Sequence, residues 1–289
     1  MTAAATWLNP GVLFRLGRVS NLPTVWTNVV AATVLAGGDP WSSRTGSVLL
    51  AMTLFYVAGM FLNDAFDREI DARERPTRPI PSGEVSAGLV FGAGFAMLAA
   101  GTMIMAFHGP LPRLAGIALA VAIVIYDLHH KANPFGPVVM GACRALVYVG
   151  AATAVAGAVT PAVILAAGAI LAHVVGLTYA AKQESLNRIG RLWPLLVLAL
   201  PLVLALPALR SGWIAVMAWL ALAAVNAVAV RRLARRDGPR AVPEAVSSLI
   251  AAVSLVDALL VAAVAPPIAA ICWLGYLLTR AFQRFVPGT

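Results

Sequence analysis

The most informative shortage in this sequence is charge. Asp, Glu, Lys and Arg make up 11% of its 289 residues, whereas a typical soluble domain has about 25%. Hydrophobic residues make up 61%, and the mean hydropathy is +0.86. So few charges could not cover a soluble protein of this length, and disordered chains are far less apolar than this one. The composition excludes both classes and predicts an all-α membrane protein.

Cysteine is almost absent. The chain has two, Cys143 and Cys272, and each lies in an apolar stretch without a second cysteine nearby. A disulfide-stabilised fold needs more cysteines, and a metal or redox pair needs a close spacing such as CxxC. The sequence therefore favours neither kind of site, and we expect both thiols to be core residues.

Long polar connections are also missing, and no internal repeat is evident, so residues 1–289 are interpreted as one membrane domain. The apolar runs fall near residues 22–38, 46–62, 86–107, 112–127, 136–157, 161–181, 192–209, 212–230, 246–265 and 267–283. Only Pro266 and Pro267 separate the last two runs, which could be two crossings or one broken helix. We expect a polytopic bundle of nine or ten transmembrane helices around a central apolar cavity.

Acidic residues are scarce relative to basic ones, 12 against 21, which gives a net charge of +9. With ten spans, 17 of the 21 basic residues fall on one side of the membrane, and the other side receives only Arg44, Arg113 and Arg210. Because basic loops stay in the cytoplasm, we expect a cell-membrane protein with a cytoplasmic amino terminus and cytoplasmic active-site loops. Anionic lipid headgroups account for the positive charge, so no nucleic-acid partner is expected.

Against this background, the end of the second span is unusually acidic. It contains Asn63-Asp64-x-x-Asp67-x-x-x-Asp71, and in a continuous helix the three aspartates would share one face. Three carboxylates on one stripe repel each other unless a cation lies among them, and such oxygen ligands suit Mg²⁺ with phosphate oxygens. The alternative is a solvated helix end whose acids pair with nearby arginines.

A stiff basic loop follows the acids. Three prolines between Arg73 and Gly83 restrict where Arg75 and Arg78 can point. A metal beside arginines suits a diphosphate leaving group, whose oxygens gain negative charge as a C–O bond breaks. The loop therefore favours a diphosphate site over a solvated helix end.

Together these residues resemble the UbiA superfamily of intramembrane prenyltransferases. The resemblance covers most of the chain and rests on the acidic motif, on the loop Arg75-Pro-Thr-Arg-Pro-Ile-Pro-Ser-Gly83 and on Arg18-x-x-Asn21. It implies Mg²⁺ as cofactor and polyprenyl diphosphate and a small, often aromatic, acceptor as substrates. By resemblance, the metal-binding residues are Asn63, Asp64, Asp67 and Asp71, with the three aspartates catalytic. Asn21, Asn63, Arg75 and Arg78 would contact the substrate.

A second acidic motif, usual in the superfamily at the end of the sixth span, is missing here. In its place the chain has Tyr179, Lys182 and Glu184, with no aspartate between residues 178 and 188. In this departure the second site resembles that of EboC-like proteins. It puts the binding of a second Mg²⁺ in doubt. We expect Lys182 to neutralise diphosphate directly, with Tyr179 as a hydroxyl donor and Glu184 beside them. The alternative is that Lys182 only anchors the helix to lipid headgroups.

Other ionisable residues lie within or beside the apolar runs. Lys131 closes the fourth span and Arg144 lies inside the fifth, and both are candidates for phosphate or acceptor contacts. For His173 and Asp257 a structural hydrogen-bonding role is expected, and Asp257 would neutralise Arg144 if their helices meet.

The sequence thus predicts an integral-membrane prenyltransferase. Its rival is a protein of the same fold that binds or transports an isoprenoid or related lipid without transferring it, and the missing second motif motivates that alternative. Transporters commonly carry ionisable residues near the membrane midplane, whereas here the charges gather at one end, which favours the enzyme. The sequence leaves the oligomeric state open.

Overall fold

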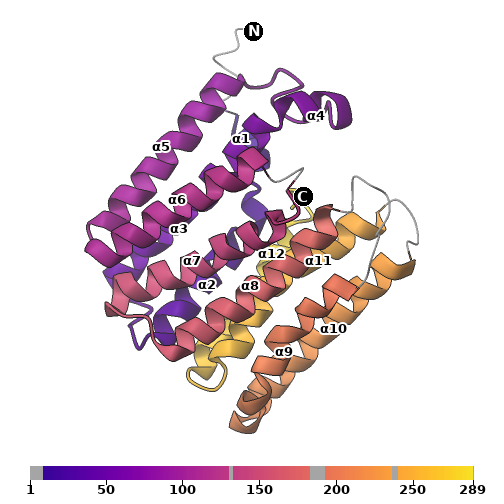
Figure 1. The fold of residues 1–289 in the computed structure, drawn as a ribbon. Helices are drawn as coiled ribbons and strands as arrows, with labels where there is room; N and C mark the ends of the chain where they lie inside the picture. The colour runs from indigo at the N-terminus through magenta and orange to yellow at the C-terminus, as the bar shows by residue number, and fades with distance from the viewer. Residues whose placement is uncertain (1–8, 130–132, 183–192, 236–239, 289) are drawn as a thin grey trace.

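The computed structural model describes residues 9–129, 133–182, 193–235 and 240–288. Within these ranges the chain forms helices and turns and no strand, which confirms the all-α prediction (Figure 1). The long helices are α2 (Leu22–Leu35), α3 (Ser43–Phe66), α5 (Ala87–Ala106), α6 (Pro110–His129), α7 (Gly136–Ala156), α8 (Pro161–Lys182), α10 (Trp213–Arg235), α11 (Ala241–Val261) and α12 (Pro266–Phe282).

The remaining elements are short. They are α1 (Pro10–Leu16), η1 (Val19–Asn21), α4 (Arg68–Glu74), η2 (Trp193–Ala199), α9 (Leu200–Leu204) and η3 (Leu206–Ser211). The last three make up the seventh apolar run, and the sequence explains why that run is not one helix. Pro194, Pro201 and Pro207 each lack the N–H that an α-helix needs, so the run is divided into 3₁₀ and α segments.

Each of the ten apolar runs corresponds to a helix or, for the seventh, to this divided segment. Eight described segments are long and apolar enough to cross a membrane. The other two runs, α2 and α12, have 14 and 17 residues, fewer than the approximately 20 that a straight crossing needs. Pro266 and Pro267 begin α12 as a separate helix that packs against α11, so the final pair of runs is a hairpin and not one broken helix.

Helix α11 lies at the centre of one half of the bundle and contacts α2, α8, α10 and α12. Of its most apolar stretch, 72% is buried inside the protein. In the other half, α3 packs on α5 and α6, and α7 joins the halves through α2, α6 and α8. Small residues permit close approach: a Cβ at Gly141 of α7 would lie 2.9 Å from the Leu171 backbone oxygen of α8.

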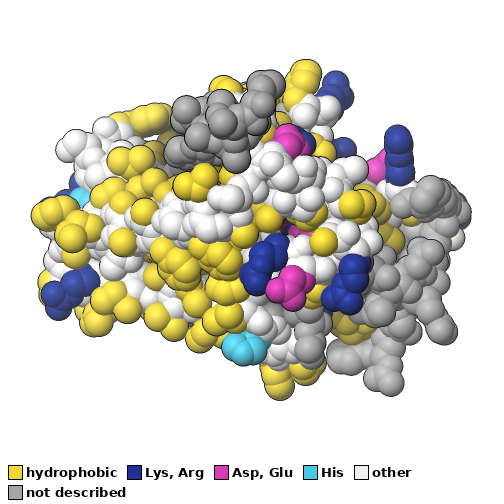
Figure 2. Space-filling model, turned by 90° about the horizontal axis from the view of Figure 1, so that it is seen from above, with side chains coloured by type: hydrophobic (Ala, Val, Ile, Leu, Met, Phe, Trp, Pro, Cys, Tyr) yellow, Lys and Arg dark blue, Asp and Glu magenta, His cyan; other side chains and the backbone are white. Residues whose placement is uncertain are grey.

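The outer surface is strongly apolar, as a lipid-facing surface must be. Phe107, Leu196 and Trp213 are among its large hydrophobic side chains, each more than 70% exposed. Viewed from above, most charged side chains lie toward the centre and right of the face, while hydrophobic side chains cover much of the left, with Lys or Arg also at the left edge (Figure 2).

Inside the bundle the minor polar and thiol groups have structural roles. Cys143 and Cys272 are buried free thiols, as expected. His173 pairs through Nε2 with the Leu249 carbonyl oxygen at 2.9 Å. Asp257 accepts hydrogen bonds from Asn28 and Tyr148 and joins α2, α7 and α11.

Candidate active site

A cavity of about 670 Å³ opens at the end of the bundle where α3 meets α4. The term "mouth" is used below for its polar part, formed by α3, α4, η1 and the residues up to Arg78. The inner wall is largely apolar, and residues from α3, α7, α8 and α11 line it: Met60, Met140, Val174, Leu177, Val246, Ile250 and Val253. The expected apolar cavity is therefore present, with a charged entrance.

The acidic stripe lies at the mouth, although not on one continuous helix. Helix α3 ends at Phe66, Asp67 forms the junction, and α4 begins at Arg68. The backbone at Asp67 stays near helical values (φ −80°, ψ −3°), so the acids remain close together. Asp64, Asp67 and Asp71 are 5%, 7% and 2% exposed. Such burial rules out a solvated helix end.

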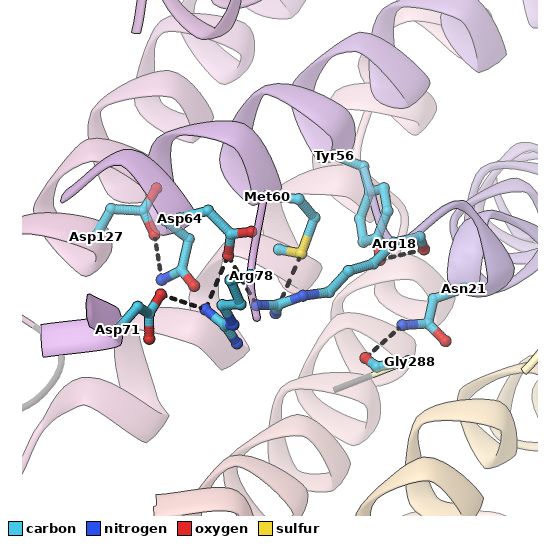
Figure 3. A network of polar contacts seen from close by, with 10 residues as sticks. Arg18, Asn21, Tyr56, Met60, Asp64, Asp71, Arg78, Asp127 and Gly288 are labelled. Atoms are coloured by element: carbon cyan, nitrogen blue, oxygen red, sulfur yellow. Dashed lines mark hydrogen bonds and ion pairs between the residues drawn. The ribbon is translucent and has the colours of Figure 1, made fainter. Parts of the chain in front are cut away.

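Two arginines neutralise these carboxylates (Figure 3). Arg78 Nη1 lies 3.0 Å from Asp64 Oδ1 and 2.7 Å from Asp71 Oδ2, so one guanidinium joins two acids. Arg18 Nη2 lies 3.2 Å from the same Asp64 Oδ1. Burial by itself would lower the pKa of Arg18, but Asp64 together with Tyr56, Tyr126 and Asp71 outweighs burial, and the pKa is raised.

Arg18 is also the one described residue other than glycine with a positive φ (φ 40°, ψ 48°). This left-handed conformation costs a non-glycine residue about 1–2 kcal/mol. The Arg18 carbonyl accepts hydrogen bonds from the Asn21 backbone N–H (3.0 Å) and from the Tyr56 hydroxyl (3.2 Å). These contacts hold the strained turn that directs the guanidinium at Asp64.

The two asparagines at the mouth are both buried. Asn63 Nδ2 donates to Asp127 Oδ1 at 3.2 Å, which ties α3 to α6. Asn21 Nδ2 donates to the Gly288 carbonyl at 3.0 Å, and Asn21 Oδ1 accepts from Gln283 Nε2 at 3.1 Å. The C-terminal segment therefore covers Asn21, and Gly288 itself lines the cavity.

The two loop arginines differ in their surroundings. Arg78 is largely buried in its ion pairs, whereas Arg75 is exposed and lines the mouth. The stiff loop thus places one guanidinium among the acids and leaves the other at the entrance, where an incoming anion would meet it.

Helix α8 presents Val174, Leu177, Thr178, Ala181 and Lys182 to the cavity, a face with helical spacing. Lys182 Nζ donates to the Asn133 carbonyl oxygen at 2.7 Å. Tyr179 packs beside the main core and is not among the residues that line this cavity. On the same helix, Thr178 lines the cavity and carries a hydroxyl. Two other predicted residues, Lys131 and Glu184, lie outside the described residues.

Arg144 lies on the inner wall, deeper than the mouth. It donates to Asn28 Oδ1 at 2.9 Å and to Thr24 Oγ1 at 3.2 Å, and its guanidinium lies 5.7 Å from the centre of the Tyr56 ring. Asn28 also donates to Asp257. The expected link between Arg144 and Asp257 therefore runs through an amide.

Sequence reasoning did not single out several residues that line this cavity, among them Tyr56, Met60, Tyr126 and Thr178. Asp127, whose Oδ1 holds Asn63, was also passed over. The available signal was a Tyr-Asp pair at the end of an apolar span, because an ionisable residue there is costly without a function. Tyr56 and Met60 carried no signal, since either is ordinary in a transmembrane helix.

The donor set suits Mg²⁺, although Arg78 now lies among the acids. In the part of the chain that the structure describes, no three His, Cys, Asp or Glu side chains converge as ligands of one ion. Yet oxygens of Asp64 and Asp71 converge on one positively charged nitrogen, and Asn63 and Asp67 line the same mouth. Hard oxygens around a position that already holds positive charge fit a cation that also binds phosphate.

Comparison with known proteins identifies the class. The model of the UbiA prenyltransferase family matches residues 24–250, so the chain belongs to this family. Curated relatives named digeranylgeranylglyceryl phosphate synthase match part of it. That of Methanoregula boonei is 35% identical over 127 residues, 42% of this chain and 43% of the relative. That of Methanothermobacter thermautotrophicus is 32% identical over 123 residues, which are 36% of this chain and 44% of the relative. These matches span less than half of each relative.

Solved structures agree on the fold. The apo structure of a UbiA homolog from Aeropyrum pernix K1 has a TM-score of 0.69 and 17% identity, covering 90% of this chain and 98% of that one. A UbiA homolog from Archaeoglobus fulgidus bound to GPP and Mg²⁺ has a TM-score of 0.60 and 16% identity, and the match covers 93% of this chain and 98% of that one. At this identity the likeness shows the fold alone.

Proposed function

We propose that this protein transfers a prenyl group from a prenyl diphosphate to a small acceptor, with Mg²⁺, at the cytoplasmic face of the cell membrane. The observation that carries the proposal is the set of buried acid–arginine pairs at the entrance of a cavity with an apolar inner wall. A prenyl diphosphate has the same division between a charged head and an apolar tail.

Each group of residues has a role that follows from its position in the cavity. Oxygens of Asn63, Asp64, Asp67 and Asp71 would hold Mg²⁺, and the bound ion would supply positive charge to the leaving diphosphate. Arg75 and Lys182 receive the diphosphate at the mouth. Arg18 and Arg78, which pair with the acids at the mouth, would donate to the phosphate oxygens of the bound diphosphate.

The prenyl chain then lies along the apolar inner wall, where methionines at positions 60 and 140 adapt to its shape. Because this wall excludes water, the allylic carbon meets the acceptor rather than solvent. The acceptor is an aromatic ring or, as the names of the curated relatives suggest, a glyceryl phosphate.

The experiment is diphosphate release from radiolabelled geranyl, farnesyl and geranylgeranyl diphosphates by the protein purified in detergent, with Mg²⁺ or with chelator. We expect Mg²⁺-dependent release that an acceptor accelerates. Asp67→Asn should lower it by about a hundredfold, because one metal-binding charge is lost. Glu69→Gln is the matched control, since Glu69 is 78% exposed two residues away. Tight binding without release would instead support the lipid-binding or transport alternative.

A further inference from the structure

Asn63 and Asp127 form a buried pair directly behind the mouth. Asn63, near the end of α3, is 8% exposed and lines the main cavity. Asp127, near the end of α6, is 5% exposed and is not among the described residues that line that cavity. It borders instead a second cavity of about 80 Å³, which Arg144 also lines. Asp127 therefore backs Asn63 and does not itself face the main cavity.

One hydrogen bond joins the pair, and its direction is defined. Asn63 Nδ2 donates to Asp127 Oδ1 at 3.2 Å (Figure 3). A side-chain amide donates through its NH₂ group and accepts, or binds a metal, through its oxygen, whereas a carboxylate only accepts. No hydrogen bond to the Asn63 oxygen is found among the described residues. With its NH₂ group held by Asp127, the amide thus leaves its oxygen for a ligand of the cavity.

A carboxylate is an unfavourable choice for a purely structural contact at this position. The second oxygen of Asp127, Oδ2, is buried and accepts no hydrogen bond from the described residues. A buried carboxylate with an unsatisfied oxygen costs more than a buried neutral group. A neutral amide or hydroxyl would also accept from Asn63, but each could donate as well. Only a group that accepts without donating prevents the Asn63 oxygen from turning toward α6.

The orientation matters most for Asn63 among the members of the acidic motif. Asp64 and Asp71 are carboxylates, and either oxygen of each can bind a cation. Asn63 has a single oxygen, and a half turn about its Cβ–Cγ bond would replace that oxygen by an NH₂ group, which cannot bind a cation. The contribution of Asn63 to a metal site therefore depends on a neighbour that fixes its amide.

We propose that Asp127 is a positioning residue, which holds the Asn63 amide by its NH₂ group so that the oxygen faces the mouth, ready to bind Mg²⁺. The inference rests on the proposed function and extends it to a residue of α6 that contacts neither substrate nor metal. Removing a hydrogen-bond partner that lies behind a metal ligand commonly lowers metal affinity by about 10- to 100-fold. The orientation of a neutral ligand is thus fixed before the ion arrives.

The test is a titration of the purified full chain with Mg²⁺, alone and with an unreactive farnesyl thiodiphosphate, followed by the melting temperature in detergent. Asp127→Asn keeps the size of the side chain and a hydrogen bond to Asn63, but the bond can then form in either direction. We expect the Mg²⁺ midpoint, the concentration of half-maximal stabilisation, to rise about tenfold. Without Mg²⁺ the melting temperature should not fall, because the hydrogen bond remains and a buried charge is removed.

A double-mutant cycle separates positioning from a direct effect of the lost charge. Removing a carboxylate near a cation site weakens cation binding whether or not Asn63 takes part. If Asp127 acts through Asn63, Asp127→Asn should cause no further rise of the Mg²⁺ midpoint in the Asn63→Ala background, so the two effects are not additive.

Asp257→Asn is the matched control. Asp257 is a buried carboxylate that also holds an asparagine, Asn28, and neither residue is among those that line the main cavity. This variant may therefore lose stability, but its Mg²⁺ midpoint should equal that of the parent. A control midpoint that rises as much as that of Asp127→Asn would mean that loss of any buried acid has this effect, and the positioning role would be wrong.

The positioning role also fails if Asp127→Asn leaves the Mg²⁺ midpoint unchanged, whatever its melting temperature, or if its effect persists in full in the Asn63→Ala background. Mg²⁺-dependent diphosphate release by the parent is scored separately. Release by the parent together with an unchanged midpoint in Asp127→Asn overturns the role of Asp127 and leaves the proposed function standing. A parent that neither binds Mg²⁺ nor releases diphosphate overturns both.

Discussion

At the scale of single residues, the central feature is a guanidinium shared by two buried carboxylates. Arg78 bonds both Asp64 and Asp71, and all three side chains are no more than 15% exposed. Removing one partner from such a buried set leaves uncompensated charge. The acids are therefore held together by positive charge, and a metal ion with a diphosphate would take over that role when the substrate binds.

This gives a prediction for Arg78→Gln. The variant should be less stable than the parent by about 3 kcal/mol, because Asp64 and Asp71 then repel each other in a buried site. Mg²⁺ should raise the melting temperature of the variant more than that of the parent, since the cation replaces the lost charge. Thermal unfolding in detergent, with and without Mg²⁺, measures both effects.

The matched control is Arg68→Gln. Arg68 and its partner Glu69 are 41% and 78% exposed, so their pair contributes at most about 1 kcal/mol. Equal Mg²⁺ shifts in the parent and the Arg78 variant would contradict a cation site among these acids.

A second residue-scale prediction concerns Lys182, which lines the cavity where the second acidic motif is missing. Lys182→Ala should weaken binding of prenyl diphosphate by about thirtyfold or more, the lower end of the loss seen when a buried charge loses its partner. The fold should be intact. Arg235→Ala, which removes an exposed charge at the same end, should leave affinity unchanged. If the Lys182 variant binds prenyl diphosphate as tightly as the parent, Lys182 does not contact the diphosphate and only anchors its helix to lipid headgroups.

At the scale of helices, the packing depends on residues that sequence patterns do not reveal. Gly275 of α12 lies against α2 and α11: a Cβ there would meet Thr27 Cγ2 at 2.5 Å and Ser254 Oγ at 3.3 Å. Thr27 cannot turn away easily, because its hydroxyl lies 3.0 Å from that of Ser254 and donates to the Thr24 carbonyl. The short helices α2 and α12 are thus fixed by a contact that only glycine permits.

We therefore expect Gly275→Ala to destabilise the protein by about 1–3 kcal/mol through overpacking. Gly92→Ala is the matched control, because a Cβ there meets nothing within 4 Å. The control should be neutral or slightly stabilising, since alanine has the better helix propensity. Melting temperatures of the two variants, measured side by side, decide this; a stable Gly275 variant would mean that α12 can move away from α2.

The scale of helices also shows how far the sequence could predict the site. Hydropathy located all ten apolar runs because burial in lipid needs long apolar stretches, and the acids were recognised because they directly follow one of those runs. The break at Asp67 was not predictable, since its backbone is nearly helical. Asp127 and Arg144 were visible as single polar residues, but their shared cavity depends on the packing of α6 against α7.

At the scale of the whole molecule, the described charges have a clear polarity. The C-termini of α3, α6, α8, α10 and α12 lie on the side of the bundle that carries the mouth. The first and last described residues lie on that side as well. Arg44 and Arg113, near the starts of α3 and α6, lie on the opposite side. The antiparallel helices thus reproduce the division of basic residues expected from the sequence. By the positive-inside rule we expect the mouth to face the cytoplasm, where a water-soluble diphosphate head could reach it.

The orientation can be measured because both native cysteines are buried and should react little with a reagent that cannot cross the membrane. Ser82, in the loop after Arg78, and Ser211, before α10, are both exposed and lie at opposite ends. With the mouth in the cytoplasm, Ser211→Cys should be labelled in intact cells, and Ser82→Cys only after permeabilisation. The parent chain gives the background. Labelling of Ser82→Cys in intact cells would place the diphosphate site outside the cell, and the proposed access from cytoplasmic substrate pools would be wrong.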